Sequence, residues 1–392
     1  MNLPPRPVVV TALGIVQIVG WGSSFYFPAV LAQPIIAETG WSLGWVVGGV
    51  SLGLLVAGLI SPRVGTVIDR TGGRPVLAAS SLFYAAGLTA IGVAPSLAVY
   101  LLGWMLVGAG MGAGAYDAAF AALGRIYGKD ARAPITNLTL FGGFASTVCW
   151  PLSAFLAETI GWRGACFVYA GLHLVLCLPL QIAVLPKSAS MPAGPTIAAD
   201  TPTPVESAAA PQPATVALLA LILTISSGIG AIVIVHLLLF AQARGMTPAA
   251  AVALGTLFGP AQVGARVVER IFGDRYHPIW TLVASCTLMA AGLILMLTIP
   301  LLAVAVVCYA AGYGIMWIAR GTLPLALFGP KRYAPLMGRL AFPGLISQAL
   351  APWFGALLLE RAGAMTTMAT LSAFAIGNVV LIGCLWAVVR RE

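Results

Sequence analysis

The sequence predicts an all-α integral membrane protein with twelve transmembrane helices, arranged as two pseudo-symmetric bundles of six. Three observations support this prediction: the composition, the recurrence of apolar segments, and an internal duplication. Hydrophobic residues make up 60% of the 392 residues and charged residues only 8%, and the mean hydropathy is +0.99. A chain of this composition has too few polar residues to cover a water-soluble globule. The lipid bilayer is therefore its expected environment.

Apolar segments long enough to cross a bilayer follow one another along almost the whole chain. A spanning helix needs about 20 mostly apolar residues. Glycine and proline inside these segments do not argue against helices, because membrane helices tolerate both. The first segment lacks a small-residue cleavage site, so we expect a retained span and not a signal peptide. The predicted helices lie at 8–35, 44–62, 76–94, 97–123, 138–157, 165–185, 215–241, 248–266, 279–297, 301–327, 339–359 and 364–389.

The charged residues are distributed unevenly around these segments, and the formal net charge is +9. If the N-terminus is cytoplasmic, the basic residues gather at cytoplasmic ends and only Arg163, Arg244 and Arg361 face outwards. This asymmetry follows the positive-inside rule. It predicts that both termini are cytoplasmic, and it explains the basic balance without nucleic-acid binding. We expect a multi-pass protein of the cell membrane, in a bacterial inner membrane.

Cysteine gives no sign of metal or redox chemistry. All six cysteines fall inside apolar segments and none has a paired CxxC spacing, so we expect small packing residues. No nucleophile with a paired base and no phosphate loop stands out. The sequence therefore predicts no metal, no cofactor and no enzymatic activity. The cysteines are Cys149, Cys166, Cys177, Cys286, Cys308 and Cys384.

A polar interruption divides the chain into two similar halves. Residues 186–213 are rich in proline, alanine, serine and threonine, and cannot supply the apolar surface needed to order themselves. We expect a cytoplasmic linker here, between an N-terminal bundle, 1–185, and a C-terminal bundle, 214–392. Parallel repeats of this kind are typical of secondary transporters, and one chain supplies both halves, so we expect a monomer. A shift of 205 residues brings Gly40 onto Gly245, Ser42 onto Thr247, Asp69 onto Asp274 and Arg70 onto Arg275.

The loop between the second and third segments carries the run GTVIDRTGGR. The loop between the eighth and ninth segments keeps a reduced copy in RIFGDRYHP, and a GWR turn precedes the sixth segment. Together with the duplication, these features resemble the major facilitator superfamily of secondary transporters, whose cytoplasmic loop signature has this pattern. The resemblance covers the whole chain and implies the MFS fold. The matching residues are Gly65, Asp69, Arg70, Gly72, Gly73 and Arg74.

The charges in this loop predict a conformational latch. Asp69 can face the positive N-terminal end of a neighbouring helix, while Arg70 and Arg74 lie at the level of the headgroups. Asp274 and Arg275 hold equivalent positions in the second half. Opening towards the cytoplasm would have to break such a cluster. The alternative is a solvated turn with basic anchors.

Two ionisable residues lie well inside apolar segments, Asp117 in the fourth and Arg320 in the tenth. Each costs several kcal/mol in a bilayer unless it is paired or lines a watery cavity. The resemblance implies that both helices line a central cavity, so the two charges would face each other. One interpretation is a permanent ion pair that fixes helix packing. In the other, Asp117 accepts a proton and Arg320 clamps the substrate.

Another arginine, Arg266, lies near the end of the eighth segment in GPAQVGARVVERIFGD. Its spacing to Asp274 is similar to that of the carboxylate-binding arginine in the monocarboxylate and oxalate:formate branch of the superfamily. This chain has Gln262 where that branch often has an acid, and Ala29 where it has a lysine. The resemblance implies that Arg266 and Gln262 bind substrate; the alternative is an interfacial arginine that snorkels. Two arginines against one aspartate favour an anionic cargo, because a guanidinium pairs with a carboxylate.

His236 in the seventh segment can titrate near neutral pH and is a further candidate for proton coupling. A hydrogen-bonded packing role is the alternative. Several aromatic residues could form the walls of a substrate site, or could instead face lipid and neighbouring helices. They are Tyr26, Phe27, Tyr116, Trp317 and Trp353.

These residues favour a secondary active transporter that moves a small, monocarboxylate-like organic anion by alternating access, coupled to protons or by exchange. Alternatives within transport are an exporter of drugs or metalloids and a carrier of a neutral, vitamin-like solute. The fifth segment lacks the GxxxGPxxGG run usual in drug exporters, and the scattered cysteines do not support arsenic chemistry. A membrane receptor or enzyme is the alternative from a different class, but the sequence shows no sensory domain and no paired intramembrane histidines or carboxylates.

Overall fold

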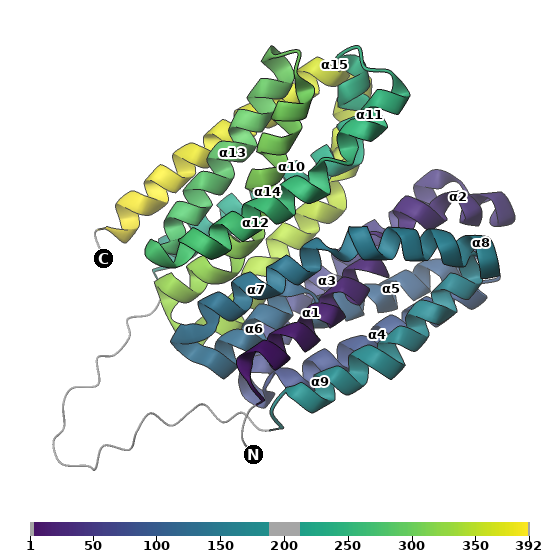
Figure 1. The fold of residues 1–392 in the computed structure, drawn as a ribbon, viewed down its shortest axis with the longest axis horizontal. Coiled ribbons are helices and arrows are strands. Elements are labelled where there is room, and N and C mark those ends of the chain that lie inside the picture. The colour runs from purple at the N-terminus through teal and green to yellow at the C-terminus, as the bar shows by residue number, and fades with distance from the viewer. Residues whose placement is uncertain (1–3, 188–211, 391–392) are drawn as a thin grey trace.

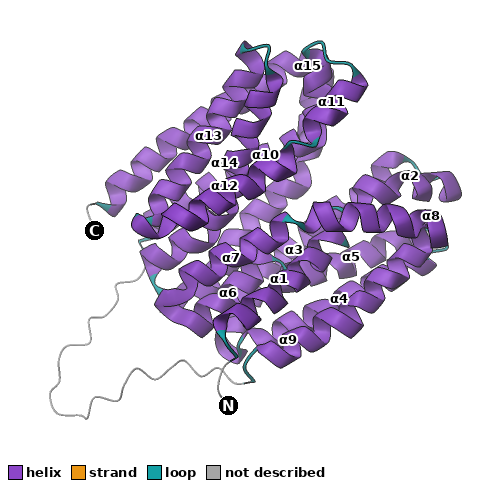
Figure 2. Ribbon diagram, viewed as in Figure 1, coloured by secondary structure: helices purple, strands orange, loops and turns teal. Residues whose placement is uncertain are grey.

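Helices account for nearly all of the chain that the computed structural model describes, which is residues 4–187 and 212–390. No strand occurs within these ranges, so the predicted all-α class is confirmed (Figure 2). The helices are α1 (Arg6–Gly22), α2 (Phe27–Thr39), α3 (Leu43–Thr71), α4 (Gly73–Val93), α5 (Leu97–Gly114), α6 (Tyr116–Tyr127), α7 (Arg132–Gly143), α8 (Ala145–Leu172), α9 (Leu178–Val184), α10 (Pro213–Ala243), α11 (Pro248–Gly255), α12 (Phe258–Phe272), α13 (Pro278–Thr298), α14 (Leu302–Phe328) and α15 (Tyr333–Val389). Short turns join some of them: η1 (Gly128–Ala131), the π-helical η2 (His173–Cys177), η3 (Gly273–Arg275) and η4 (Pro330–Arg332).

The described residues form nine continuous helical runs that are long and apolar enough to cross a membrane. Two runs are too long for one crossing, because 88 residues at about 1.5 Å each extend far beyond a hydrocarbon layer of about 30 Å. The longer run, Leu97–Val184, contains the η1 turn and a break at Gly161, where φ is 74°. The other, Pro330–Val389, breaks at Gly363, where φ is 77°. Glycine adopts this left-handed conformation at little cost, and the breaks leave room for the twelve predicted crossings.

The helices lie in two groups that follow the order of the chain. Figure 1 shows α1–α9, in purple to teal, on one side and α10–α15, in green to yellow, on the other. The groups touch through α3 and α6 against α15, and through α7 against α12 and α14. The predicted domain boundaries at 185 and 214 remain a prediction, and residues 188–211 of the predicted linker lie outside the described residues.

The two groups meet closely near the end of the molecule where the described chain begins and ends, which we call the terminal end (Figure 1). Gly65 of α3 crosses Gly338 of α15 there, and a side chain at either glycine would overlap the backbone of the other helix. Ser61 adds a hydrogen bond of 3.0 Å from its hydroxyl to the carbonyl of Gly338. Small residues allow membrane helices to approach at backbone distance.

Four of the predicted spans are interrupted inside the segment, which the sequence analysis did not anticipate. The first breaks at Ser23–Tyr26, where the Ser24 hydroxyl donates to the carbonyl of Gly20 at 2.6 Å and Pro28 lacks an N–H for the next turn. The others break at Ala115, Phe144 and Thr256–Leu257. Irregular backbone inside a membrane protein is tolerated where it is buried in protein or lines a cavity. In transporters, discontinuous helices commonly form the substrate site.

Candidate functional site

An ion pair between Asp117 and Arg320 links the two groups of helices. The Nε of Arg320 donates to Oδ1 of Asp117 at 2.8 Å and an Nη donates to Oδ2 at 2.9 Å. A second Nη donates to the hydroxyl of Ser227 at 3.3 Å. Two parallel bonds between a guanidinium and a carboxylate fix both distance and orientation. The two charges expected to face each other are therefore in contact.

Each partner of this ion pair has a further contact within its own helix. Asp117 lies in the first turn of α6, directly after the break at Ala115, and the positive end of the helix dipole stabilises a carboxylate there. Arg320 is 2% exposed and its guanidinium lies 5.3 Å from the ring of Trp317. Removing one partner of such a buried pair leaves an uncompensated charge and costs about 3–5 kcal/mol.

Arg266 is buried to the same degree but has a different environment. It is 3% exposed and donates to the Gly314 carbonyl at 3.0 Å, the Thr139 carbonyl at 2.7 Å and the side-chain oxygen of Gln262 at 3.2 Å. Among the described residues, no carboxylate lies within 4.0 Å of its guanidinium. The nearby acid Glu269 is engaged elsewhere, by the hydroxyls of Tyr276 and Thr281.

Arg266 therefore lies inside the protein. Its hydrogen bond to the Thr139 carbonyl joins the two groups, since Thr139 belongs to α7 and Arg266 to α12. Within residues 4–187 and 212–390, its hydrogen-bond partners are all neutral oxygens. A buried charge without a counter-charge is unfavourable by several kcal/mol. An anion that reached this guanidinium would relieve that cost.

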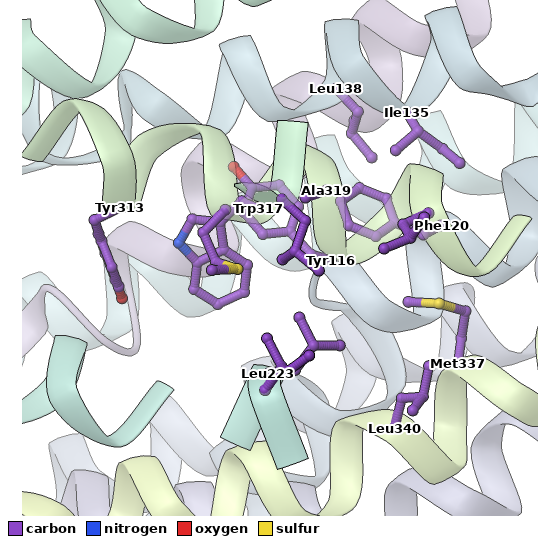
Figure 3. Packing of buried hydrophobic residues seen from close by; sticks show 14 of the residues in the cluster. Tyr116, Phe120, Ile135, Leu138, Leu223, Tyr313, Trp317, Ala319, Met337 and Leu340 are labelled. Atoms are coloured by element: carbon purple, nitrogen blue, oxygen red, sulfur yellow. The ribbon is translucent and has the colours of Figure 1, made fainter. Parts of the chain in front are cut away.

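Three aromatic rings lie between the two arginines and a cavity. Trp21, Tyr116 and Trp317 have ring centroids 5.3, 5.4 and 5.7 Å apart, and Figure 3 shows Trp317 between Tyr313 and Tyr116. Together with Asp117 they line a small cavity that is partly open to solvent. Tyr116 lies beside Arg266, and its hydroxyl donates to the same Thr139 carbonyl at 3.3 Å.

Trp21 was missed by the sequence analysis. Its Nε1 donates to the Gln17 side chain at 3.1 Å, and Gln17 donates to the Gly114 carbonyl at 2.8 Å, just before the break in the fourth span. A glutamine one turn before a tryptophan in an otherwise apolar helix was the available signal. The pair ties α1 to the broken segment that presents Asp117.

The other predicted aromatic residues lie outside the cavity lining. Tyr26 packs against Phe25 and Trp150 and lies within electrostatic range of Arg266. Phe27 is fully buried against Trp104, inside the N-terminal group. Trp353 is 64% exposed and contacts Phe354. The structure does not bring Phe27 or Trp353 to the cavity.

His236 also lies away from the cavity lining. Its Nε2 is 3.1 Å from the carbonyl oxygen of Pro352, and its ring is tilted against that of Phe240. These contacts join α10 to α15 within the C-terminal group. A different histidine, His173, is buried at the π-helical turn, where it bonds the Ser23 hydroxyl at 2.9 Å and stacks on Tyr84.

The predicted latch residues lie at the terminal end. Asp69 is 3.5 Å from Arg125 of α6, and its position at a helix N-terminus stays a prediction. Arg70 is exposed and Arg74 half-buried. Gly72 has a φ of 86°, and Gly73 packs too closely against Ala122 to carry a side chain.

The reduced copy of the motif is tied across the two groups by Arg132, which the sequence analysis did not single out. This residue of α7 donates to the carbonyl of Tyr276 at 2.8 Å and to that of Gly273, and lies 3.9 Å from Asp274. Asp274 also pairs with Arg270 at 3.2 Å.

Two further side chains complete this cluster. Arg275 lies over the ring of Phe272. Burial, and then the hydrogen bond to the Glu269 carboxylate, raises the pKa of Tyr276 to about 12, so its hydroxyl stays protonated and donates.

No group of three metal-ligating side chains occurs in residues 4–187 and 212–390. What the central residues can do chemically is bind: Asp117 and the aromatic rings line the cavity, Arg320 pairs with Asp117, and the unbalanced Arg266 lies behind the ring of Tyr116. Such a site can exchange charged partners without covalent chemistry.

Comparisons with known proteins identify relatives of this fold. The sequence profile described as Major Facilitator Superfamily matches residues 12–271. No curated protein sequence matches the chain significantly. Among solved structures, the human organic anion transporter MFSD10 (TETRAN) aligns over 97% of this chain and 100% of its own, with a TM-score of 0.72 and 14% identity.

Two further structures align as broadly. The major facilitator transporter FucP in the outward conformation covers 97% of this chain and 98% of its own, with a TM-score of 0.74 and 12% identity. The proton:xylose symporter XylE covers 96% and 94%, with a TM-score of 0.71 and 12% identity. At these identities the similarity shows the fold.

Proposed function

Because the chain belongs to the Major Facilitator Superfamily, we propose that it carries a small organic anion of the monocarboxylate kind by alternating access, with proton coupling or exchange. The chain is a multi-pass membrane protein of the secondary-transporter kind and not an enzyme. One structural neighbour is an organic anion transporter and another a sugar symporter, so the neighbours do not choose the cargo. We choose an anionic cargo because of the buried charges of Arg266, Arg320 and Asp117.

The observation that carries the proposal is the unbalanced charge of Arg266. Asp117 neutralises Arg320, but only neutral oxygens surround Arg266 among the described residues. A cationic drug would add to this charge, and a neutral solute would leave it uncompensated. A carboxylate would pair with it, and Gln262 beside it can donate or accept one further hydrogen bond.

Asp117 and Arg320 supply the coupling step in this proposal. A proton on Asp117 removes the charge that holds Arg320, which frees the guanidinium to bind the cargo. Cargo and Asp117 thus compete for one partner. The latch between the groups at the terminal end, made by Arg132 with the η3 turn, opens when the loaded carrier turns to that side, whereas the Asp69–Arg125 pair lies within the N-terminal group.

The proposal is tested by binding to the purified full chain, with benzoate and acetate as anionic probes in calorimetry. Replacing a buried charge that pairs with a ligand costs about 2–5 kcal/mol, so Arg266→Gln is expected to weaken binding about 100-fold. Arg339→Gln, which removes an exposed charge from α15, is the matched control and keeps wild-type affinity. Equal affinity in wild type and Arg266→Gln would refute an anion seat at this residue.

A further inference from the structure

The cavity beside the ion pair has an unusual surface for a site that binds a small anion. Its walls are the rings of Trp21, Tyr116 and Trp317, with Met111 and Leu345. Only the side chains of Ser61 and Asp117 add polar groups to these walls. The exposed lining is mostly apolar, although a carboxylate alone would call for polar partners.

Most polar side chains of these walls already have hydrogen-bond partners within the protein. The Ser61 hydroxyl donates to the carbonyls of Gly58 and Gly338, at 2.8 and 3.0 Å. The indole N–H of Trp21 donates to Gln17 at 3.1 Å. A polyhydroxylated cargo would find few free partners here, and its hydroxyls would lose their bonds to water.

The three rings are inclined to one another, and so present both faces and edges. The planes of Trp21 and Trp317 meet at 70°, and that of Tyr116 is tilted by 49° and 47° to them. Aromatic rings prefer offset and edge-to-face contacts of this kind. The sulfur of Met111 adds a group that packs well against a ring.

The charge arrangement rejects a cationic ring. The guanidinium of Arg320 already lies over Trp317, and Arg266 lies behind Tyr116 through the shared Thr139 carbonyl. A cation on these rings would face two arginines against the single carboxylate of Asp117, which already pairs with Arg320. An aromatic ring that carries one carboxylate would place its apolar part on the rings and its charge towards the arginines.

We infer, building on the proposed function, that the cargo is an aromatic monocarboxylate whose ring packs on Trp21, Tyr116 and Trp317 from the side of Met111 and Leu345. Acetate and other short carboxylates satisfy the arginines but leave the ring surface unfilled. They bind more weakly. A saturated ring of the same size fills the space without the complementary ring edges and binds with intermediate affinity.

The test is calorimetry on the full chain with benzoate, cyclohexanecarboxylate and acetate at one pH. Benzoate is expected to bind at least about tenfold more tightly than acetate, because it adds apolar burial and ring contacts. Trp21→Leu is expected to weaken benzoate about threefold to tenfold and to leave acetate unchanged. Trp280→Leu, at an exposed tryptophan that packs on Trp386 outside the cavity, is the control and changes neither.

A second variant guards against misfolding of Trp21→Leu. Leu345→Trp fills the cavity, so it is expected to exclude benzoate while acetate still binds. Equal affinity of the wild-type protein for acetate and benzoate would overturn the inference, but the proposed function as an anion transporter would still stand. Equal weakening of both ligands by Trp21→Leu would also overturn it. Binding of none of the three carboxylates would overturn the inference and the proposed function together.

Discussion

At the scale of single residues, the two buried arginines have different tasks because their surroundings differ. Arg320 has a carboxylate partner in Asp117, with two hydrogen bonds below 3 Å. Arg266 has three neutral oxygens. Arg320 can bind cargo only after Asp117 releases it, whereas Arg266 can attract an anion at any time. A proton can therefore act on the Asp117–Arg320 pair, while Arg266 attracts the anion.

Asp117→Asn tests this division. The substitution leaves Arg320 without its counter-charge, so the unliganded protein is expected to lose about 3–5 kcal/mol of stability. Benzoate then gains a second free guanidinium, and the thermal shift it produces becomes larger than in wild type. In liposomes, exchange of labelled benzoate persists while accumulation driven by a pH gradient is lost. Proton-driven accumulation at the wild-type level would exclude Asp117 as the proton carrier.

The central charges were within reach of sequence reasoning, and their neighbours were not. Asp117 and Arg320 stand out because charged residues are rare in apolar segments, and both are now seen in contact. Trp21 resembles any lipid-facing tryptophan until its ring is seen against those of Tyr116 and Trp317. Phe27 was predicted to line the site only because it is an aromatic residue in an apolar segment. It packs instead in the core around Trp104.

At the scale of elements, the positions of the helices follow from apolar length, but their interruptions do not. The predicted spans fit the long helices, since hydropathy alone sets where the chain must cross. The breaks at Ala115 and Phe144 fall inside continuous apolar runs, so no change in composition marks them. They depend on local hydrogen bonds and on packing across helices. Each break displaces a helix end, and that at Ala115 sets the first turn that carries Asp117.

Arg132 joins α7 to the η3 turn, and the internal duplication of the sequence gave no indication of this contact. Arg132→Gln removes the hydrogen bonds to the carbonyls of Gly273 and Tyr276, so the terminal end is expected to open more often. The readout is labelling of an Ala334→Cys reporter by a membrane-impermeant thiol reagent in a Cys384→Ser background; Ala334 is buried at the seam between the groups, where its carbonyl faces Gly65. Labelling is expected to rise several-fold.

The control for this experiment is Lys129→Gln, which removes an exposed charge from the neighbouring η1 turn. It is expected to label at the wild-type rate. An unchanged rate in Arg132→Gln would show that the tie does not hold the terminal end closed.

At the scale of the whole molecule, contacts between the two groups are concentrated on α3, α6 and α7 against α12, α14 and α15. At the opposite end, Figure 1 shows α2 and α11 well separated. Close packing at one end with separation at the other is the geometry that alternating access requires of two rocking bundles. The ion pair and the three rings lie where the groups face each other, so any rocking motion must rearrange them.

The most direct test of the account concerns the sign of the charge that the central site accepts. Three ligands of similar size, benzoate, benzamide and benzylammonium, are titrated into the purified full chain, in wild type and in Arg266→Gln. The account predicts that benzoate binds wild type about 100-fold more tightly than either other ligand, and that Arg266→Gln abolishes this preference. Binding of benzamide or benzylammonium as tight as that of benzoate would contradict it.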